Sequence, residues 1–445
     1  MNGELNFDDI LIFPEIIEIK RINQYFLVIS VETANWIVLS DSYQLDFLNQ
    51  LRQGVCIGDI AEAIDTEEHF KEFQALLAAL FARKFAGVDQ LPQKEYLEGY
   101  KMLNIYVTNA CNLRCKHCFM NSGTRLKNEL PVDEWIKILT EFRENGGETV
   151  TFSGGEPLMN KGLPQMVKHA HGVGLKVTIL SNGILWTEQL IKSLAPFIDE
   201  IQFSIDGVNE QTNAVVRGKG NFQKVVETVV CFANSGVKTS VATTFTYENL
   251  EDDTHLKYKA LREAIIDRTQ SDVFFKLSKK LLPGREVHIS AEANELYAKR
   301  IKEIEQFIDK NADYENFMVG HSPNLIALNC GLGGISISAD GYVYFCNRIA
   351  EVENYGHVFD HPLSFYMTKG REIHKETSVD NVEPCATCEL RYICDGGCRI
   401  DDFDFHGRLK NATKPFKQIS CTEEKKRNLM QRMIDSYNYF YDFEE

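Results

Sequence analysis

The sequence predicts an α/β protein whose centre is a partial TIM-like (β/α)6 barrel. One observation predicts the barrel, and two more predict a separate module on either side of it. Strand-like and helix-like stretches alternate six times between residues 101 and 310, apolar residues recur at helical spacing within the first 95 residues, and cysteines crowd together after residue 329. Regular alternation of strand and helix is typical of parallel βαβ units. A chain of 445 residues also exceeds what one hydrophobic core usually supports, so several domains are expected.

The first 95 residues predict a winged helix-turn-helix module. Runs rich in Ile, Phe and Val at residues 10–22, 25–31 and 36–39 indicate short strands, and residues 42–51, 57–64 and 66–85 indicate helices, with Asp65 and Thr66 capping the third. A DNA-binding module of this kind carries a basic stripe. Residues 1–90, however, hold 6 Lys and Arg against 15 Asp and Glu, a balance of −9. The module is therefore expected to bind a peptide, and a basic one.

The barrel is assigned to residues 96–315, with its chemistry expected at the carboxyl ends of the strands, where the motifs below fall. The expected strands are 103–107, 149–152, 176–180, 200–204, 238–245 and 272–277, and the expected helices are 132–144, 162–171, 187–194, 222–234, 254–268 and 291–309.

The region from 316 to 421 is expected to be a loop-rich domain stapled by metal, because the periodicity fails where the cysteines gather. Residues 422–445 form the last segment. A helix over residues 422–441 is expected to dock on the protein surface through the apolar residues Leu429, Met430, Met433, Ile434, Tyr437 and Phe440.

Composition and charge narrow the classes of protein. The chain is 44% hydrophobic and 25% charged, which is typical of a soluble globular protein. No apolar run approaches the roughly 18 residues of a membrane span, and the acidic start differs from a signal peptide, so a cytoplasmic protein is expected. A net charge of −16 argues against nucleic acid and membrane partners. In a reducing compartment, clustered cysteines indicate metal or redox ligands.

The first cysteine group follows the first expected barrel strand. Cys111, Cys115 and Cys118 form a C-x3-C-x2-C triplet. Three thiolates suit a four-iron cluster with one iron left open, since structural zinc prefers four protein ligands. This triplet, after the first strand of six β/α units, resembles the radical SAM superfamily. The resemblance implies that S-adenosylmethionine chelates the open iron and is cleaved reductively to a 5′-deoxyadenosyl radical.

Further motifs carry the same resemblance. A GGEP motif follows the second expected strand, and short Ser, Asn and Asp turns follow the third and fourth, where the family places contacts to the ribose and carboxylate of S-adenosylmethionine. His117 stands where the family usually has an aromatic side chain against the adenine. The cofactor contacts that the resemblance implies are His117, Gly154, Gly155, Glu156, Pro157, Ser181, Asn182, Ser204, Asp206 and Arg217.

The second cysteine group resembles the SPASM extension that part of this family carries. The run from Cys385 to Cys398 alone would also fit a zinc ribbon. The resemblance implies two auxiliary [4Fe-4S] clusters, the first on Cys330, Cys346 and Cys398, the second on Cys385, Cys388, Cys394 and Cys421, making three clusters in all. Cys231, in an apolar helical run, and Cys56 remain as structural residues.

A missing cysteine bears on the reaction. Some SPASM enzymes carry a further cysteine a few residues after the first, but residues 331–338 contain none. The first auxiliary cluster is therefore expected to have an open iron that could hold a substrate thiolate. Water, or a Glu or His side chain, is the alternative ligand.

Together these resemblances imply a radical SAM oxidoreductase that matures ribosomally made peptides, as sactipeptide and ranthipeptide enzymes do. The N-terminal module would recognise a leader peptide by strand addition. The expected product is a thioether between a cysteine sulfur and a carbon, and a reductant such as flavodoxin or ferredoxin is the expected redox partner. The main alternative is a carbon–carbon crosslink of the cyclophane type.

Two other functions fit less well. Sulfatase-maturing relatives carry an aspartate base directly after the cysteine of the G-x4-C motif, where this chain has Asn347, which cannot accept a proton. An iron–sulfur regulator that reads DNA through the winged helix is opposed by the −9 balance. No residue of the sequence is assigned as the catalytic acid or base.

Overall fold

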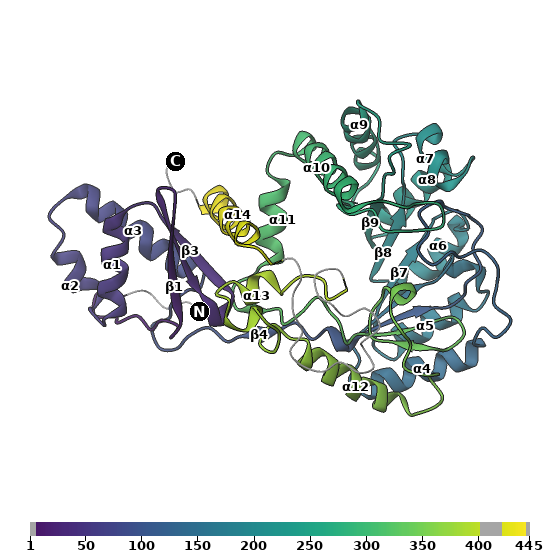
Figure 1. Cartoon of the computed structure of the whole chain (residues 1–445), viewed down its shortest axis with the longest axis horizontal. Coiled ribbons are helices and arrows are strands. Elements are labelled where there is room, and N and C mark those ends of the chain that lie inside the picture. The colour runs from purple at the N-terminus through teal and green to yellow at the C-terminus, as the bar shows by residue number, and fades with distance from the viewer. Residues whose placement is uncertain (1–5, 401–420, 442–445) are drawn as a thin grey trace.

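The computed structural model describes residues 6–400 and 421–441. The N-terminal module lies at one end of the molecule and the barrel at the other (Figure 1). The C-terminal helix returns to lie beside the strands of the N-terminal module (Figure 1).

One eight-stranded sheet forms the barrel. Six strands pair in parallel with their neighbours in sequence, which is the order of a (β/α) barrel and not of a doubly wound sheet. The six predicted strands are confirmed to within two residues at each end, and the two remaining strands come from beyond residue 330. The strands are β5 (Met102–Tyr106), β6 (Thr149–Ser153), β7 (Lys176–Ser181), β8 (Glu200–Ser204), β9 (Lys238–Thr243), β10 (Val273–Leu277), β12 (Ile335–Ile337) and β13 (Val343–Tyr344).

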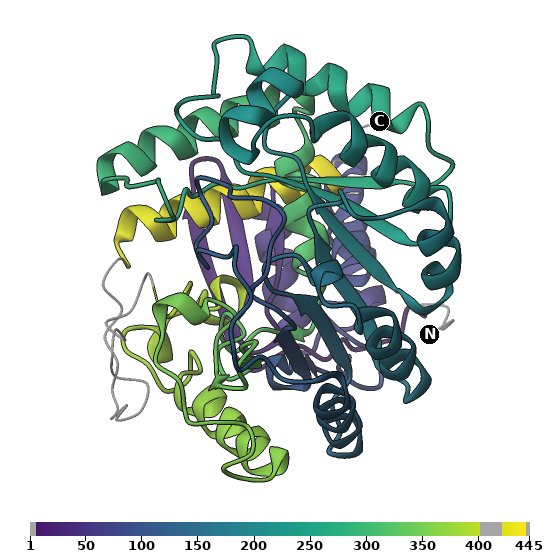
Figure 2. The ribbon, with the colours of Figure 1, turned by 90° about the vertical axis from the view of Figure 1, so that its right-hand side faces the viewer.

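Helices cover the outer face of this curved sheet (Figure 2). In α4, Trp135, Ile138, Leu139 and Phe142 are buried, a one-sided apolar stripe at helical spacing that packs into the barrel core. No helix in the described ranges is both long and apolar enough to cross a membrane. The helices are α4 (Val132–Glu144), α5 (Leu163–Gly172), α6 (Glu188–Leu194), α7 (Glu210–Arg217), α8 (Phe222–Ala233), α9 (Thr254–Ile266) and α10 (Ala291–Ile308).

The N-terminal module contains the expected three strands and three helices. The strands form an antiparallel sheet in the order β1-β2-β3, but the first begins at Ile17, so residues 10–16 lie outside it. Side chains cap the helices: Thr66 caps the third, as expected, and the Cys56 sulfur accepts from the Asp59 amide, 3.4 Å away. Cys56 is therefore structural. The elements are β1 (Ile17–Ile22), β2 (Tyr25–Ser30), β3 (Asn35–Leu39), α1 (Ser42–Arg52), α2 (Ile57–Glu62) and α3 (Glu67–Ala82).

The region after the barrel is more regular than expected. It contributes β12, which pairs in parallel with β5, and β13, which pairs antiparallel with β12. Its longest helix, α12, buries an apolar stripe of Leu363, Tyr366, Met367 and Ile373 against the barrel core. The remaining elements are β4 (Glu95–Tyr96), α11 (Ala312–Gly320), β11 (Leu325–Ile326), α12 (Leu363–Glu376) and α13 (Arg391–Cys394).

The C-terminal helix α14 (Glu423–Tyr441) joins the N-terminal module to the rest of the chain. It packs against β3 and α11, and the indole nitrogen of Trp36 donates to the Met433 carbonyl oxygen at 3.2 Å. Four of the expected apolar residues are buried and Leu429 is partly buried. The expectation for Phe440 is wrong, since its side chain is 45% exposed. One apolar core thus joins this helix, α11 and α13 to the N-terminal module.

Candidate active site

The first cysteine triplet lies in a loop that follows β5 and is held from two sides. The buried carboxylate of Glu129 accepts from the Thr108 hydroxyl at 2.8 Å and from the Asn109 amide at 2.8 Å. Arg285, from the segment between β10 and α10, donates to the Cys115 carbonyl at 2.9 Å and also to the Ser122 carbonyl. Arg285 binds main-chain carbonyls and Glu129 binds a main-chain amide and a hydroxyl, so together they set the path of the cysteine loop.

The thiols of this triplet lie close enough to affect one another's ionisation. Burial raises the pKa of Cys111, and the nearby Cys118 raises it further, whereas the Leu113 amide and Arg217 lower it. Burial also raises the pKa of Cys115, against the influence of Arg217. The triplet and Arg217 therefore lie close to one another.

Glu156 joins the turn after β6 to the turn after β7. Its carboxylate is fully buried and accepts from the Ser181 hydroxyl at 2.9 Å and from the Asn182 amide at 2.7 Å. Burial raises the pKa of Glu156 to about 7, although the hydrogen bonds from Asn182 and Ser181 lower it. The Asn182 side-chain nitrogen lies 3.9 Å from the Cys111 sulfur. The carboxylate thus has partners within the chain, and the cofactor contact that the resemblance implies for Glu156 stays a prediction.

The two glycines before Glu156 let this turn approach the cysteine loop. A Cβ on Gly155 would lie 2.3 Å from the Ala110 carbonyl oxygen, and Gly154 has a φ of +136°. The Gly155 amide donates to the Thr108 carbonyl at 2.8 Å, and Pro157 starts a short 3₁₀ turn. The GGEP turn therefore packs directly against the cysteine loop, and a side chain at Gly155 would prevent this contact.

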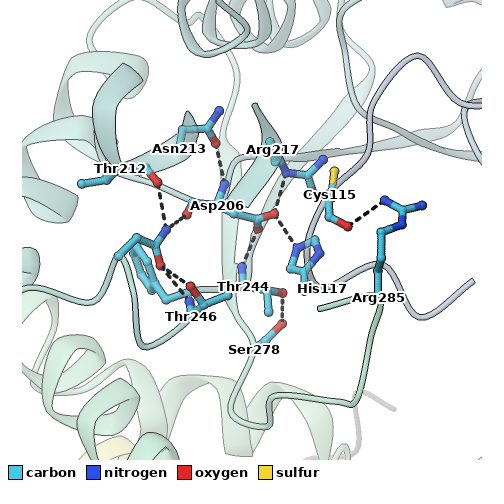
Figure 3. Close-up of polar contacts among 12 residues, drawn as sticks. Cys115, His117, Asp206, Thr212, Asn213, Arg217, Thr244, Thr246, Ser278 and Arg285 are labelled. Carbon is cyan, nitrogen blue, oxygen red and sulfur yellow. Dashed lines mark hydrogen bonds and ion pairs between the residues drawn. The ribbon is translucent and has the colours of Figure 1, made fainter. Parts of the chain in front are cut away.

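Asp206 is the centre of a second buried network, after β8 (Figure 3). Its Oδ2 atom lies 2.5 Å from Arg217 Nε and 2.6 Å from His117 Nε2, and its Oδ1 atom accepts from the Thr244 amide at 2.7 Å. Burial alone would raise the pKa of Asp206, but Arg217 and His117 outweigh it and lower the pKa to about 2. The site thus holds two buried carboxyl groups with opposite pKa shifts. Ser204, at the end of β8, takes no part in this network.

Sequence reasoning missed the residues that support these groups. Asn213, in α7, accepts from the Asp206 amide at 3.0 Å, and Asn249 donates to the Asp206 carbonyl. Glu129 and Arg285 brace the cysteine loop. Only the capping pattern around Asn209 signals α7, because the helix has eight residues. No local pattern signals Arg285, whose partners are carbonyl groups more than 160 residues away.

Cys330, Cys346 and Cys398 form a second group of neighbouring thiols. A hydrogen bond with the Cys398 thiol raises the pKa of Cys330, and burial raises that of Cys346, with Cys398 adding to it. Amide groups point at two of the sulfurs: Arg399 N lies 3.5 Å from Cys330 Sγ, and Arg348 N lies 3.4 Å from Cys346 Sγ. These are the three thiols that the resemblance assigned to the first auxiliary cluster.

The four remaining assigned cysteines line one cavity of about 300 Å³ between α13 and α14. Burial raises the pKa of Cys385 to about 11, and the thiols of Cys394, Cys421 and Cys388 raise it, against Arg399. Lys425 and Lys426 line the same cavity. The ten thiols therefore fall into groups of three, three and four.

The donor sets fit iron–sulfur clusters by their chemistry. Cysteine thiolates are the usual ligands of such clusters, and hydrogen bonds to the sulfurs stabilise their negative charge. Within the described residues, no three His, Cys, Asp or Glu side chains form a set that could hold one metal ion. Cys231, outside the groups, is partly buried against the barrel core, in agreement with its expected role.

Comparison with known proteins relates the middle of the chain to a known family. Residues 105–258 match the Radical SAM superfamily, so this part of the chain is a radical SAM domain. The Streptococcus suis protein SuiB bound to S-adenosylmethionine has the same fold, with a TM-score of 0.51 at 16% identity over 87% of this chain and 96% of SuiB. The anSMEcpe enzyme with bound AdoMet gives 0.52 at 20% identity, over 76% of this chain and 99% of that enzyme.

Curated relatives cover several chemistries. The mycofactocin maturase MftC of Mycolicibacterium smegmatis is 26% identical over 67% of this chain and 77% of its own length. The sporulation killing factor maturation protein SkfB of Bacillus subtilis is 30% identical over 33% of this chain and 36% of its own length. An S-adenosylmethionine-dependent nucleotide dehydratase of Lacinutrix mariniflava is 30% identical over 39% of this chain and 34% of its own length. In SkfB and the nucleotide dehydratase, the match spans only about a third of the relative's own length.

Proposed function

We propose that this protein is a radical SAM peptide maturase that joins a cysteine sulfur to a carbon of a ribosomally made precursor peptide. The grouping of ten thiols into three, three and four carries the proposal. The names of the relatives SkfB and MftC, a maturation protein and a maturase, support a maturation reaction.

The first triplet would hold the cluster that binds S-adenosylmethionine, and the bound pair supplies the one-electron chemistry that removes a hydrogen atom from carbon. Around this cluster, residues of the chain would hold the site in a fixed arrangement and keep water out of it. Glu156 ties together two turns, and the Asp206 carboxylate holds both Arg217 and His117 in place. Such buried, hydrogen-bonded groups change position little on binding, so a charged ligand would meet a preformed polar site.

The second thiol group has three members, and the chain offers no fourth cysteine for it. Seven of the 12 cysteines belong to the other two groups, and Cys56 and Cys231 lie elsewhere. A substrate thiolate could complete this group, as the expected thioether chemistry needs. This count favours a thioether over a carbon–carbon crosslink.

The N-terminal module would recognise the peptide through a cavity beside β3. This cavity, of about 480 Å³, lies between β3, α3 and α14 and is lined by Gln44, Lys71, Ala75, Tyr437 and Tyr441 among others. The module's net charge of −9 suits a basic leader. A cavity of this size beside a sheet edge can hold one or two peptide side chains.

The free edge of β3 already has side-chain partners. The Trp36 amide donates to the Asn35 side chain at 2.9 Å, the Trp36 carbonyl accepts from Arg83 Nε at 3.3 Å, and the Ser40 amide donates to Gln44 at 2.9 Å. A full added strand would have to displace these groups. We therefore propose that side chains of the leader bind in the cavity, while strand addition at a sheet edge, the mode that the sequence predicted, stays a prediction.

The decisive experiment is tandem mass spectrometry of the short peptide encoded beside the gene, after incubation with reduced enzyme and S-adenosylmethionine. A loss of two hydrogens that maps to a cysteine sulfur supports the proposal. A loss of two hydrogens between carbons selects the carbon–carbon alternative, and an unchanged mass overturns both. Cys115→Ala, which removes one ligand of the first triplet, is the inactive control.

Iron counting tests the proposed cofactors independently of the peptide. Three [4Fe-4S] clusters predict about 12 iron atoms per chain, whereas one cluster with zinc predicts about four. Cys346→Ala should remove about four iron atoms and leave the other two clusters in place. A wild-type count near four would overturn the assignment of the auxiliary clusters.

A further inference from the structure

Arg348 and Glu351 form an ion pair directly after Cys346. Arg348 Nε donates to Glu351 Oε1 at 2.7 Å, and a second guanidinium nitrogen contacts the other carboxylate oxygen. The side chains are 17% and 28% exposed. A two-point contact of this kind fixes the plane of the guanidinium, so the direction of its remaining N–H groups is set as well.

Arg348 contacts two thiols of the second group through different atoms. Its main-chain amide donates to Cys346 Sγ at 3.4 Å, and its Nη1 atom donates to Cys398 Sγ at 3.5 Å. Nothing in the proposed maturase function assigns a role to this ion pair.

We infer that the Arg348–Glu351 pair sets the reduction potential of the iron–sulfur group held by Cys330, Cys346 and Cys398. The inference rests on the proposed function for the presence of that group. Reduction adds negative charge, which a nearby guanidinium and its hydrogen bond to sulfur stabilise. Glu351 has two effects: it holds the guanidinium against Cys398, and its own charge opposes reduction.

Substitution of the two residues is therefore expected to shift the reduction potential in opposite directions. Arg348→Gln removes the positive charge and should lower the potential of this one group. Glu351→Gln removes a negative charge but keeps an oxygen that can accept from the guanidinium, so it should raise the potential. Arg348→Lys keeps the charge without the fixed fork, so its potential should lie between those of Arg348→Gln and the wild type. Damage to the site in general would move both Gln variants in the same direction.

The test is a potentiometric titration of the anaerobic holoenzyme, followed by electron paramagnetic resonance, with iron content measured for each variant. The other two clusters serve as internal references and should not shift. Lys369 and Glu372 on α12 offer a matched control, because they form an ion pair at the same spacing with side chains 42% and 54% exposed. Lys369→Gln and Glu372→Gln should leave all three potentials unchanged.

Shifts of the same sign in the two Gln variants, equal shifts in all clusters, or no shift at full iron content would overturn the inference. If Arg348→Gln loses iron, the test rests on Glu351→Gln alone. A potential in Glu351→Gln that equals that of the wild type, or lies below it, then refutes the inference. Failure of the proposed function would show separately, as an unchanged peptide mass in an enzyme whose potentials still shift as expected.

Discussion

Arg217 Nε lies 2.5 Å from Asp206 Oδ2, in a place where the side chains are 10% and 1% exposed. The pair links α7 to the turn after β8, and His117 ties the same carboxylate to the cysteine loop. A buried ion pair contributes little net stability, yet removal of one partner leaves an uncompensated charge. This relationship therefore fixes the geometry of three separate segments at the site.

Asp206→Asn should lower the free energy of unfolding by about 3–5 kcal/mol, because it leaves Arg217 buried without its charge partner. The double variant Asp206→Asn with Arg217→Met should lose less than the sum of the two single losses. Anaerobic urea unfolding of the four proteins measures this coupling. If the losses add to within about 0.5 kcal/mol, the two side chains do not act as a pair.

Glu156 should make stability fall as the pH rises from about 4.5 to 7. Its pKa is raised in the folded protein, so the folded state binds the proton more tightly than the unfolded state and gains stability below pH 4.5. A shift from 4.5 to about 7 corresponds to about 3 kcal/mol. The difference between the wild type and Glu156→Gln, in unfolding experiments across this range, isolates the effect. Parallel curves for the two proteins would contradict it.

The barrel strands could be predicted, and candidate site residues could be chosen, because both depend on local patterns. Apolar periodicity marks each strand and helix, and cysteine spacing marks the thiol groups. The parallel pairing then brings the ends of β5, β6, β7 and β8 to one edge of the sheet. The triplet, Glu156, Asn182 and Asp206 meet there for this reason.

The pairing of side chains within the site could not be predicted, because it depends on how loops return across the sheet. Asp206 meets Arg217 only because α7 folds back over the turn after β8. The three-residue strand β12 lies in a glycine-rich stretch whose short pattern does not distinguish strand from loop. The joining of α14 to the N-terminal module depends on contacts between opposite ends of the chain.

Arg285→Gln should weaken cluster binding at the first triplet without abolishing the fold. The arginine donates to the carbonyls of Cys115 and Ser122 and to the Asn121 side chain, and bonds from a charged donor contribute about 1.5–3 kcal/mol each. The variant should hold fewer iron atoms than the wild type and lose them faster to a chelator. Arg268→Gln, at an exposed pair with Glu227, is the control. If both variants lost iron equally, Arg285 would have no specific role in holding the cluster at the first triplet.

Filling the cavity beside β3 should impair peptide binding and leave the clusters intact. Ala75 lines this cavity from α3, so Ala75→Trp would occupy the space that we assign to leader side chains. We expect the dissociation constant of the precursor peptide to rise by about tenfold or more, which is about 1.4 kcal/mol. Fluorescence anisotropy with the labelled precursor peptide measures this change, and iron content shows whether the fold is kept. Ala78→Trp places the same ring on the exposed face of the same helix and should bind as the wild type does. Unchanged binding by Ala75→Trp, or equal losses in both variants, would refute recognition in this cavity and return the leader to another surface of the module.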